Sequence, residues 1–257
     1  MKKGMISLLV VIVLFSLSCQ FLSPDPGGGT VISNCADVIS AIRGLQPGGA
    51  PQALLETGVK QGDEFDVNDY FNVLPHISMQ DGYSLDYVYQ VDSLGAFPIL
   101  YALPDGQEPY ASMSDVPADT KFVDYADHLN IEDVEQGYFE FVAMRIMAGQ
   151  FYLDWHANYN DTDIVCDRGD VRDIISSVNA GDFGMKFDLS QQTQARALKN
   201  VEPRVTLNGD TAVVQVVTFT KWGGFYRLTY TISRAFPHTL IDVKDENLVP
   251  YDCGVMF

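Results

Sequence analysis

The chain has 257 residues, of which 34 are acidic and 16 basic, so its net charge at pH 7 is -18. This excess of negative charge repels nucleic acid and anionic lipid headgroups, which excludes both as direct partners of the protein surface. Apolar residues make up 47% of the sequence and charged residues 19%, as in an ordinary globular domain.

The first nineteen residues are typical of an export signal. Lys2 and Lys3 precede an apolar run, 5–17, which is followed by Ser18 and Cys19. A basic start, a short apolar segment and small residues at its end mark a secretory signal peptide. The run is shorter than the roughly 20 residues that cross a hydrocarbon core, which argues against a transmembrane helix.

This segment resembles the lipobox of bacterial lipoproteins. The resemblance implies that residues 1–18 are removed and that Cys19 carries a lipid, which anchors the protein in a membrane and faces it away from the cytoplasm. It implies no functional family. Ser16 stands where a lipobox usually carries Leu, Val or Ile, and Ser16 and Ser18 also suit ordinary signal peptidase. The alternatives are therefore a free secreted protein and an uncleaved anchor.

The next residues predict a flexible spacer. Positions 23–29 read Ser-Pro-Asp-Pro-Gly-Gly-Gly, a composition that cannot bury a core. We expect residues 19–33 to be a lipid-anchored tether. Residues 34–257 are then expected to form a single extracytoplasmic domain, long enough to bury a substantial core.

Two helices follow from the spacing of apolar residues. After Asn34, an expected N-cap, apolar side chains recur at helical spacing up to a Pro-Gly-Gly stop at 47–49. Asp170 is expected to cap a second helix, in which residues 171, 174, 175 and 178 form an apolar stripe before Gly181. A third candidate, 190–199, has a thin apolar stripe.

Three predicted hairpins share one turn pattern, in which Gly opens a two-residue loop and Phe begins the return strand. Gly at the first loop position suits a type II′ turn, because that residue takes positive φ. In the second hairpin the register pairs Arg145 with Asp154 on one face, and sets residues 142, 144 and 146 against 157, 155 and 153 on the other. In the third it places Val217 and Phe219 opposite Tyr230 and Leu228. The turns are Gly95-Ala96-Phe97, Gly149-Gln150-Phe151 and Gly223-Gly224-Phe225.

The C-terminal third is expected to be an antiparallel meander. A strand at 204–207 joins through Asn208-Gly209, a type I′ signal, to a strand that begins at Thr211, and residues 240–243 add a last strand. The acidic stretch 104–137 is typical of a long surface loop, with one helical turn near 125–129. Together these elements predict an α+β fold, mostly antiparallel sheet, with two or three short helices packed on one face.

Three cysteines follow Cys19: Cys35, Cys166 and Cys253. Disulfides persist outside the cytoplasm, so we expect one pair and one unpaired thiol. Of the three pairings we favour Cys166 with Cys253, because Cys35 adjoins the tether. None of these cysteines has the Cys-x-x-Cys spacing of a metal site.

The return strand of the second hairpin holds the candidate ligand contacts. Strand alternation projects Asp154, His156 and Asn158 from one face, about 7 Å apart at successive positions. Asp154 beside His156 could transfer a proton or bind a metal, whereas a solvated face with Asp154 paired to Arg145 does neither. Trp222 is a further candidate contact, because burial is hard to arrange beside a tight turn.

The remaining signals argue against an enzyme. The sequence has no nucleophile, phosphate-binding or zinc-protease motif, and the acidic run 158–170 lacks the Gly and Glu of a calcium loop. His76, His128 and His238 are isolated and are expected to be structural or exposed. We expect no catalytic residue, metal or cofactor.

The favoured function is a membrane-tethered binding or assembly module of the cell envelope, with an envelope protein or a small molecule as its partner. The alternative is a small extracytoplasmic hydrolase or metal-dependent enzyme that uses Asp154 and His156.

Overall fold

The computed structural model describes residues 28–118, 122–182 and 184–255. Cys19, the predicted signal peptide 1–18 and most of the predicted tether lie outside these ranges. The α-helices are α2 (Cys35–Leu45), α3 (Gln52–Thr57), α4 (Tyr70–Val73), α5 (Glu135–Met147), α6 (Arg168–Ala180) and α7 (Leu189–Arg196). The short 3-10 helices are η1 (Val67–Asp69), η2 (Met113–Asp115), η3 (Tyr125–His128) and η4 (Trp155–Asn160). The strands are β1 (Thr30–Val31), β2 (Ile77–Met79), β3 (Tyr83–Asp92), β4 (Gly95–Pro104), β5 (Leu129–Ile131), β6 (Thr162–Val165), β7 (Arg204–Asn208), β8 (Thr211–Thr220), β9 (Gly224–Ser233) and β10 (Leu240–Pro250).

Six strands form the main sheet, and all of their pairings are antiparallel. The order is β1-β7-β8-β9-β10, and β6 pairs with β8 as well. β8 uses Thr211–Gln215 against β7 and Val217–Thr220 against β6, so these two strands follow one another along one edge of β8. β3 pairs with β4, and β2 with β5, in two small sheets. The predicted α+β fold with mostly antiparallel strands is confirmed.

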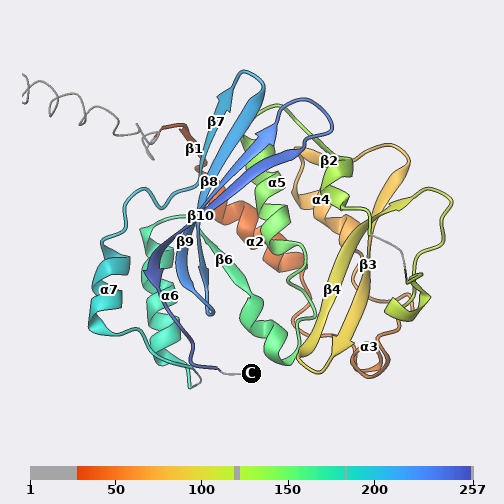
Figure 1. The fold of residues 1–257 in the computed structure, drawn as a ribbon, viewed down its shortest axis with the longest axis horizontal. Coiled ribbons are helices and arrows are strands. Elements are labelled where there is room, and N and C mark those ends of the chain that lie inside the picture. Colours follow the sequence, from red (N-terminus) through yellow and green to blue (C-terminus); the bar gives the residue numbers. More distant parts are fainter. Residues whose placement is uncertain (1–27, 119–121, 183, 256–257) are drawn as a thin grey trace, which may run out of the picture.

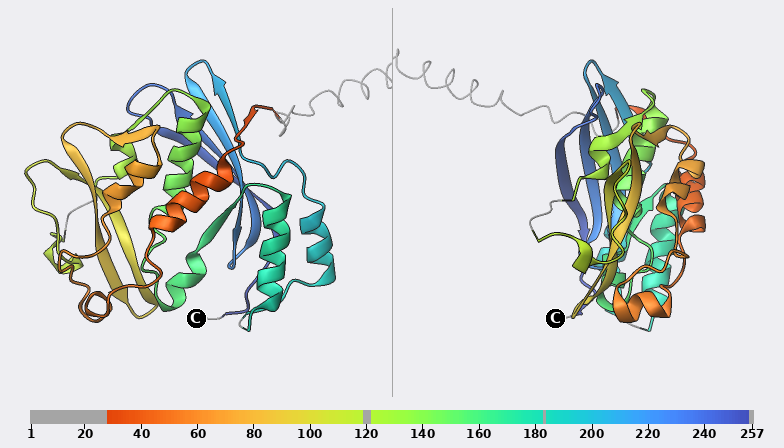
Figure 2. Two further views of the ribbon diagram at one scale, coloured as in Figure 1. Left: turned by 180° about the vertical axis from the view of Figure 1, so that it is seen from behind. Right: turned by 90° about the vertical axis from the view of Figure 1, so that its right-hand side faces the viewer.

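The elements are spread along the length of the molecule. The β3–β4 hairpin and the helices α6 and α7 lie at opposite ends, with α2 and α5 between them (Figure 1). Seen from the side, the blue strands of the main sheet run along one side and α2, in orange-red, along the other (Figure 2). No helix in the three described ranges has both the length and the apolar character needed to cross a membrane.

Buried residues form two hydrophobic cores, and β8 contributes to both. The larger core surrounds α5 and includes Val214 and Val216 of β8. The smaller core includes Val217 and Phe219 of β8, together with the apolar stripe of α6. Because successive strand residues point to opposite faces, the two cores contact opposite faces of β8. Helices α5 and α6 therefore pack on opposite faces of this strand.

Helix α5 is the element that departs most from the sequence prediction. Nine of its 13 residues are buried, among them Glu140. A helix buried on all sides lacks a polar stripe, so the helical period is lost and the alternation of Val142, Met144 and Ile146 imitates a strand. The predicted second hairpin is wrong, because η4 takes the place of its return strand. Arg145 forms its ion pair with Asp124, at 2.8 Å, and not with Asp154.

The first and third predicted hairpins exist, with loops that differ from the prediction. Asp92 pairs with Gly95 and Thr220 with Gly224, so the loops are 93–94 and 221–223. Phe219 consequently faces Phe225, and the predicted register of that hairpin is wrong.

Gly95 and Gly224 open the return strands with φ of 142° and 93°. A Cβ on Gly95 would lie 2.6 Å from the carbonyl oxygen of Asp154, and one on Gly224 would collide with that of Val249. Both glycines therefore permit a close backbone approach of a third segment, rather than forming a type II′ turn.

The predicted surface loop at 104–137 has its helical turn, η3, but also contains the mostly buried strand β5 and the start of α5, whereas other predicted elements are confirmed. α2 begins directly after Asn34, the hairpin at Asn208 joins β7 to β8, and β10 is the last strand. The N-cap of α6 is Asp167, while Asp170 completes a capping box with it, so this helix begins earlier than predicted. The fold also includes residues before Asn34, because Thr30 and Val31 pair with β7. Residues 30–33 therefore belong to the fold and not to the tether.

Two helical glycines with opposite surroundings provide a stability test. A Cβ on Gly137, in the first turn of α5, would collide with the backbone oxygen of Glu132, whereas one on Gly44 in α2 would meet nothing within 4 Å. We expect Gly137→Ala to lower the free energy of unfolding by roughly 1 to 3 kcal/mol. Gly44→Ala, the matched control, should raise it by about 0.5 to 1 kcal/mol. Urea unfolding of both variants checks the prediction, and equal effects would contradict the close packing of α5.

Candidate functional site

A groove of about 450 Å³ lies between α2, β6 and α6, beside the end of β8. Its size suits a small organic ligand. Its apolar lining comes from four different elements, with Ile39 on α2, Ile164 on β6, Ile174 on α6 and Phe219 on β8. The groove therefore forms only when α2 and β8, which are distant in the sequence from each other and from the consecutive elements β6 and α6, fold against them.

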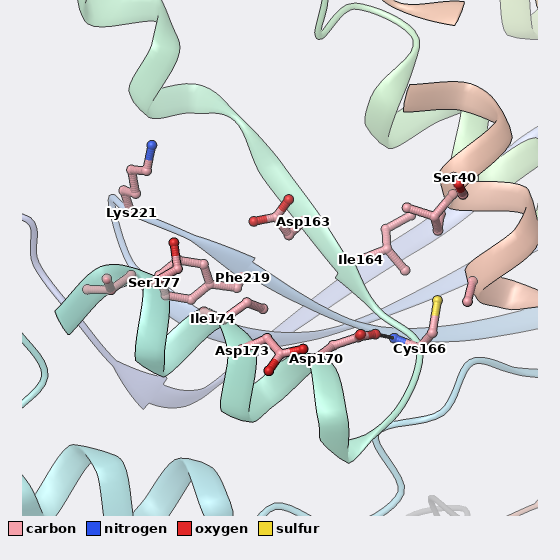
Figure 3. Close-up of a pocket in the computed structure, with 13 residues that line it drawn as sticks. Ser40, Asp163, Ile164, Cys166, Asp170, Asp173, Ile174, Ser177, Phe219 and Lys221 are labelled. Carbon is pink, nitrogen blue, oxygen red and sulfur yellow. Dashed lines mark hydrogen bonds between the residues drawn. The ribbon is translucent and has the colours of Figure 1, made fainter. Parts of the chain in front are cut away.

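Polar side chains complete the lining of the groove. Asp163 and Ile164 leave β6 on opposite sides, Asp163 toward the side of Lys221 and Ile164 toward α2 (Figure 3). Asp173 and Ser177 line the groove from α6, and Ser40 lines it from α2. Since the carboxylates outnumber the one ammonium among these side chains, the lining is acidic overall.

Asp163 is held in an unfavourable electrostatic position. Partial burial and the nearby Asp161 carboxylate raise its pKa, whereas Arg43 and Lys221 oppose that shift. The Nη2 atom of Arg43 lies 2.8 Å from Asp161 Oδ1 and 3.5 Å from Asp163 Oδ1, so one guanidinium forms ion pairs with two carboxylates. A cationic ligand group at this position would offset the repulsion between them.

Asp170 lines the groove but has a structural role. Its carboxylate accepts a hydrogen bond from the backbone N–H of Cys166 at 2.7 Å, drawn as a dashed line in Figure 3. It also accepts one from Asp167 at 3.3 Å. Both bonds satisfy N–H groups at the start of α6, so Asp170 fixes the turn from β6 into this helix.

A disulfide between Cys35 and Cys166 joins α2 to this turn. The predicted pair of Cys166 with Cys253 is therefore wrong, and Cys253 is a buried free thiol in the smaller core. The prediction assumed that Cys35 adjoins a flexible segment. Instead β1 holds the preceding chain on β7, and Cys35 is the first residue of α2. The disulfide ties one wall of the groove to the other.

The four predicted contact residues lie outside this groove. Asp154 precedes η4, and its backbone bridges to Ala96 of β4. His156 and Asn158 belong to η4 and line a second hollow of about 530 Å³, together with Trp155 and Lys221. Trp222 contacts the same helix, with its ring 5.5 Å from that of Tyr159. The structure thus brings three of the four residues near one another, but on a short helix and a loop rather than on a strand.

The sequence did not predict the pairing of His76 with the buried carboxylate of Glu140. The Nδ1 atom of His76 lies 2.7 Å from a carboxylate oxygen of Glu140, and the His76 backbone N–H donates to the other oxygen at 2.9 Å. The Glu140 side chain is only 2% exposed. The prediction that His76 stands alone is wrong. The available signal was Glu140 itself, a charged residue within the apolar run 138–144, because buried charges need partners.

Neither this pair nor the groove forms a metal centre. In the described ranges, no group of three or more His, Cys, Asp or Glu side chains is arranged to hold a metal ion. Comparisons with known proteins add no relative: no family model, no curated protein and no solved structure matches the chain.

Proposed function

We propose that the protein is a non-catalytic binding module, held outside the cytoplasm by a lipid on Cys19, and that the groove between α2, β6 and α6 is its binding site. The groove itself carries the proposal, because it combines an apolar lining, acidic groups and a covalent brace between its walls. The Cys35–Cys166 disulfide suits an oxidising compartment. The export signal of residues 1–18 supports the same location.

The lining favours a ligand with an apolar body and a cationic end. Contact with Ile39, Ile174 and Phe219 would contribute about 0.8 kcal/mol for each CH₂ group that it removes from water. A cationic group would lie near Asp163, whose pKa is raised by partial burial and by the Asp161 carboxylate, and would favour its ionised form. Binding of such a ligand should weaken as the pH falls and Asp163 takes up a proton.

The enzyme alternative has less support. It required Asp154 and His156 side by side on a strand face, and these residues instead flank the start of η4. We therefore assign the region of His156, Asn158 and Trp222 no catalytic role.

Native mass spectrometry of the protein extracted from its own membrane tests the proposal. We expect a lipid-sized mass on Cys19 and a noncovalent ligand on the wild-type protein. Ile174→Trp fills the groove and should remove the ligand mass. Ser176→Trp is the matched control, because Ser176 is an exposed residue of the same helix outside the groove. That variant should retain the ligand.

The two parts of the proposal fail separately. An unmodified Cys19 would contradict the anchor. An acylated protein that carries no ligand, or a ligand that persists in Ile174→Trp, would contradict the assignment of the groove.

A further inference from the structure

We propose that a second site, formed around Lys60, Asp86 and Tyr87, binds adjacent hydroxyl groups of a neutral carbohydrate. This Lys60 pocket has a volume of about 470 Å³ and is lined by residues of 60–66, β3 and 109–111. It lies beside β3, at the end of the molecule opposite α6 (Figure 1). It shares no lining residue with the groove, so it does not depend on the function proposed above.

An almost buried ion pair forms one wall of the Lys60 pocket. The Nζ atom of Lys60 lies 2.6 Å from Asp86 Oδ1, and the two side chains are only 13% and 15% exposed. The hydroxyl of Tyr101, the cross-strand neighbour of Asp86, donates to Asp86 Oδ2 at 2.6 Å. The backbone N–H of Lys60 donates to the Ala111 carbonyl at 2.9 Å, which fixes the two lining loops together. The pair is therefore held in place before any ligand arrives.

This ion pair retains unused hydrogen-bonding capacity. An ammonium has three donors, and Asp86 is the one acceptor that Lys60 meets among the described residues. Each carboxylate oxygen of Asp86 accepts one such bond and has room for a second. A donor and an acceptor thus stand side by side at the pocket, where water or a ligand must satisfy them.

Tyr87 supplies a third unsatisfied group. Its side chain is 2% exposed, and its hydroxyl has no hydrogen-bond partner among the described residues. The ammonium of Lys60 lies 4.7 Å from the centre of its ring. Burial raises the pKa of Tyr87, and the charges of the pocket carboxylates Glu64 and Asp86 raise it further. The Tyr87 hydroxyl is therefore close enough to both carboxylates to interact with their charge. A buried hydroxyl left without a partner is unfavourable, so a ligand hydroxyl that reaches it would bind more tightly.

These features match a sugar better than an ion. Glu64, Asp66 and Asp86 outnumber Lys60, so the pocket repels anions. A hydroxyl group donates and accepts at once, so two adjacent hydroxyls can bond to Lys60 and Asp86 together. Half-buried Phe65 and Tyr110 supply aromatic surface for the apolar face of a pyranose ring.

Saturation-transfer NMR tests the proposal and detects sugars that bind with a Kd near 1 mM. The sugars are D-glucose, D-galactose, D-mannose and N-acetyl-D-glucosamine, each at about 10 mM. At least one sugar should receive saturation from the wild-type protein. Lys60→Met should weaken its binding about tenfold or more. Tyr87→Phe should weaken it about three- to tenfold without a loss of stability, because this variant removes an unsatisfied hydroxyl. Lys244→Met, which breaks an exposed ion pair with Asp242 on β10, should bind as the wild type does.

The proposal is overturned if none of the four sugars receives saturation from the wild-type protein. It is equally overturned if binding is unchanged in Tyr87→Phe, which keeps the result independent of whether Lys60→Met folds.

Discussion

Replacing Cys35 and Cys166 together by serine should lower the free energy of unfolding by about 4 to 5 kcal/mol. The bond links residues separated by 131 positions, and a loop of that length restricts the unfolded chain strongly. Such a loss is a large share of the stability of a typical domain. Guanidinium unfolding of the oxidised wild-type protein and of the double variant measures it.

The wild-type protein treated with a reducing agent is the control, because it should lose the same amount without any substitution. Peptide mapping under non-reducing conditions should recover Cys35 linked to Cys166, with Cys253 as a free thiol. A bridge that contains Cys253 would contradict the structure, and so would a reduced protein as stable as the oxidised one.

His76→Ala should lower the free energy of unfolding by about 2 to 3 kcal/mol. The substitution removes the imidazole that lies 2.7 Å from Glu140 and leaves a carboxylate only 2% exposed with fewer partners. Two hydrogen bonds remain, from the His76 backbone and from Gln136 at 3.0 Å, which is why the loss falls below that of a fully orphaned charge. Urea unfolding measures the difference.

Glu132→Ala is the matched control for this pair. Its carboxylate lies 3.8 Å from the other ring nitrogen of His76 and is 62% exposed, so its removal should cost less than about 1 kcal/mol. A double-mutant cycle between His76→Ala and Glu140→Gln should show a coupling of at least about 0.5 kcal/mol. Equal costs for His76→Ala and Glu132→Ala would contradict the stabilising role of the His76–Glu140 pair.

The sequence was most informative where one face of an element is buried and the other is solvated. α6 has one buried and one solvated face, so its apolar stripe predicted the helix. The stripe did not predict the N-cap, which is Asp167 rather than Asp170. α5 has no solvated face, and its buried run imitated a strand. The error then spread to its neighbours, because the strand pairing of Asp154, His156 and Asn158 depended on it.

The hairpin loops were predicted at the wrong residues for a different reason, which lies in their glycines. A sequence pattern records that glycine is present, but not whether it serves a turn or a close approach by a distant segment. At Gly95 the approaching backbone is that of Asp154, and at Gly224 it is that of Val249. Neither contact follows from local spacing, and so the loops at 93–94 and 221–223 were placed incorrectly.

The candidate sites depend even more on tertiary contacts. The groove takes its lining from α2, β6, α6 and β8, and the Lys60 pocket from segments before, within and after β3. No single stretch of sequence carries either pattern. The Cys35–Cys166 bond likewise requires that β1 hold the N-terminal segment on the sheet, a strand of only two residues that no periodicity reveals.

The position of β8 in both cores makes the two halves of the molecule one cooperative unit. Neither core can melt without exposing the opposite face of the same strand, so local opening at one end is coupled to the other. A ligand of the groove, at a free concentration 100 times its Kd, would therefore raise the free energy of unfolding of the whole fold by about 2.7 kcal/mol. Amide protons of β3 and β4, far from the groove, would then exchange more slowly wherever their exchange requires global unfolding.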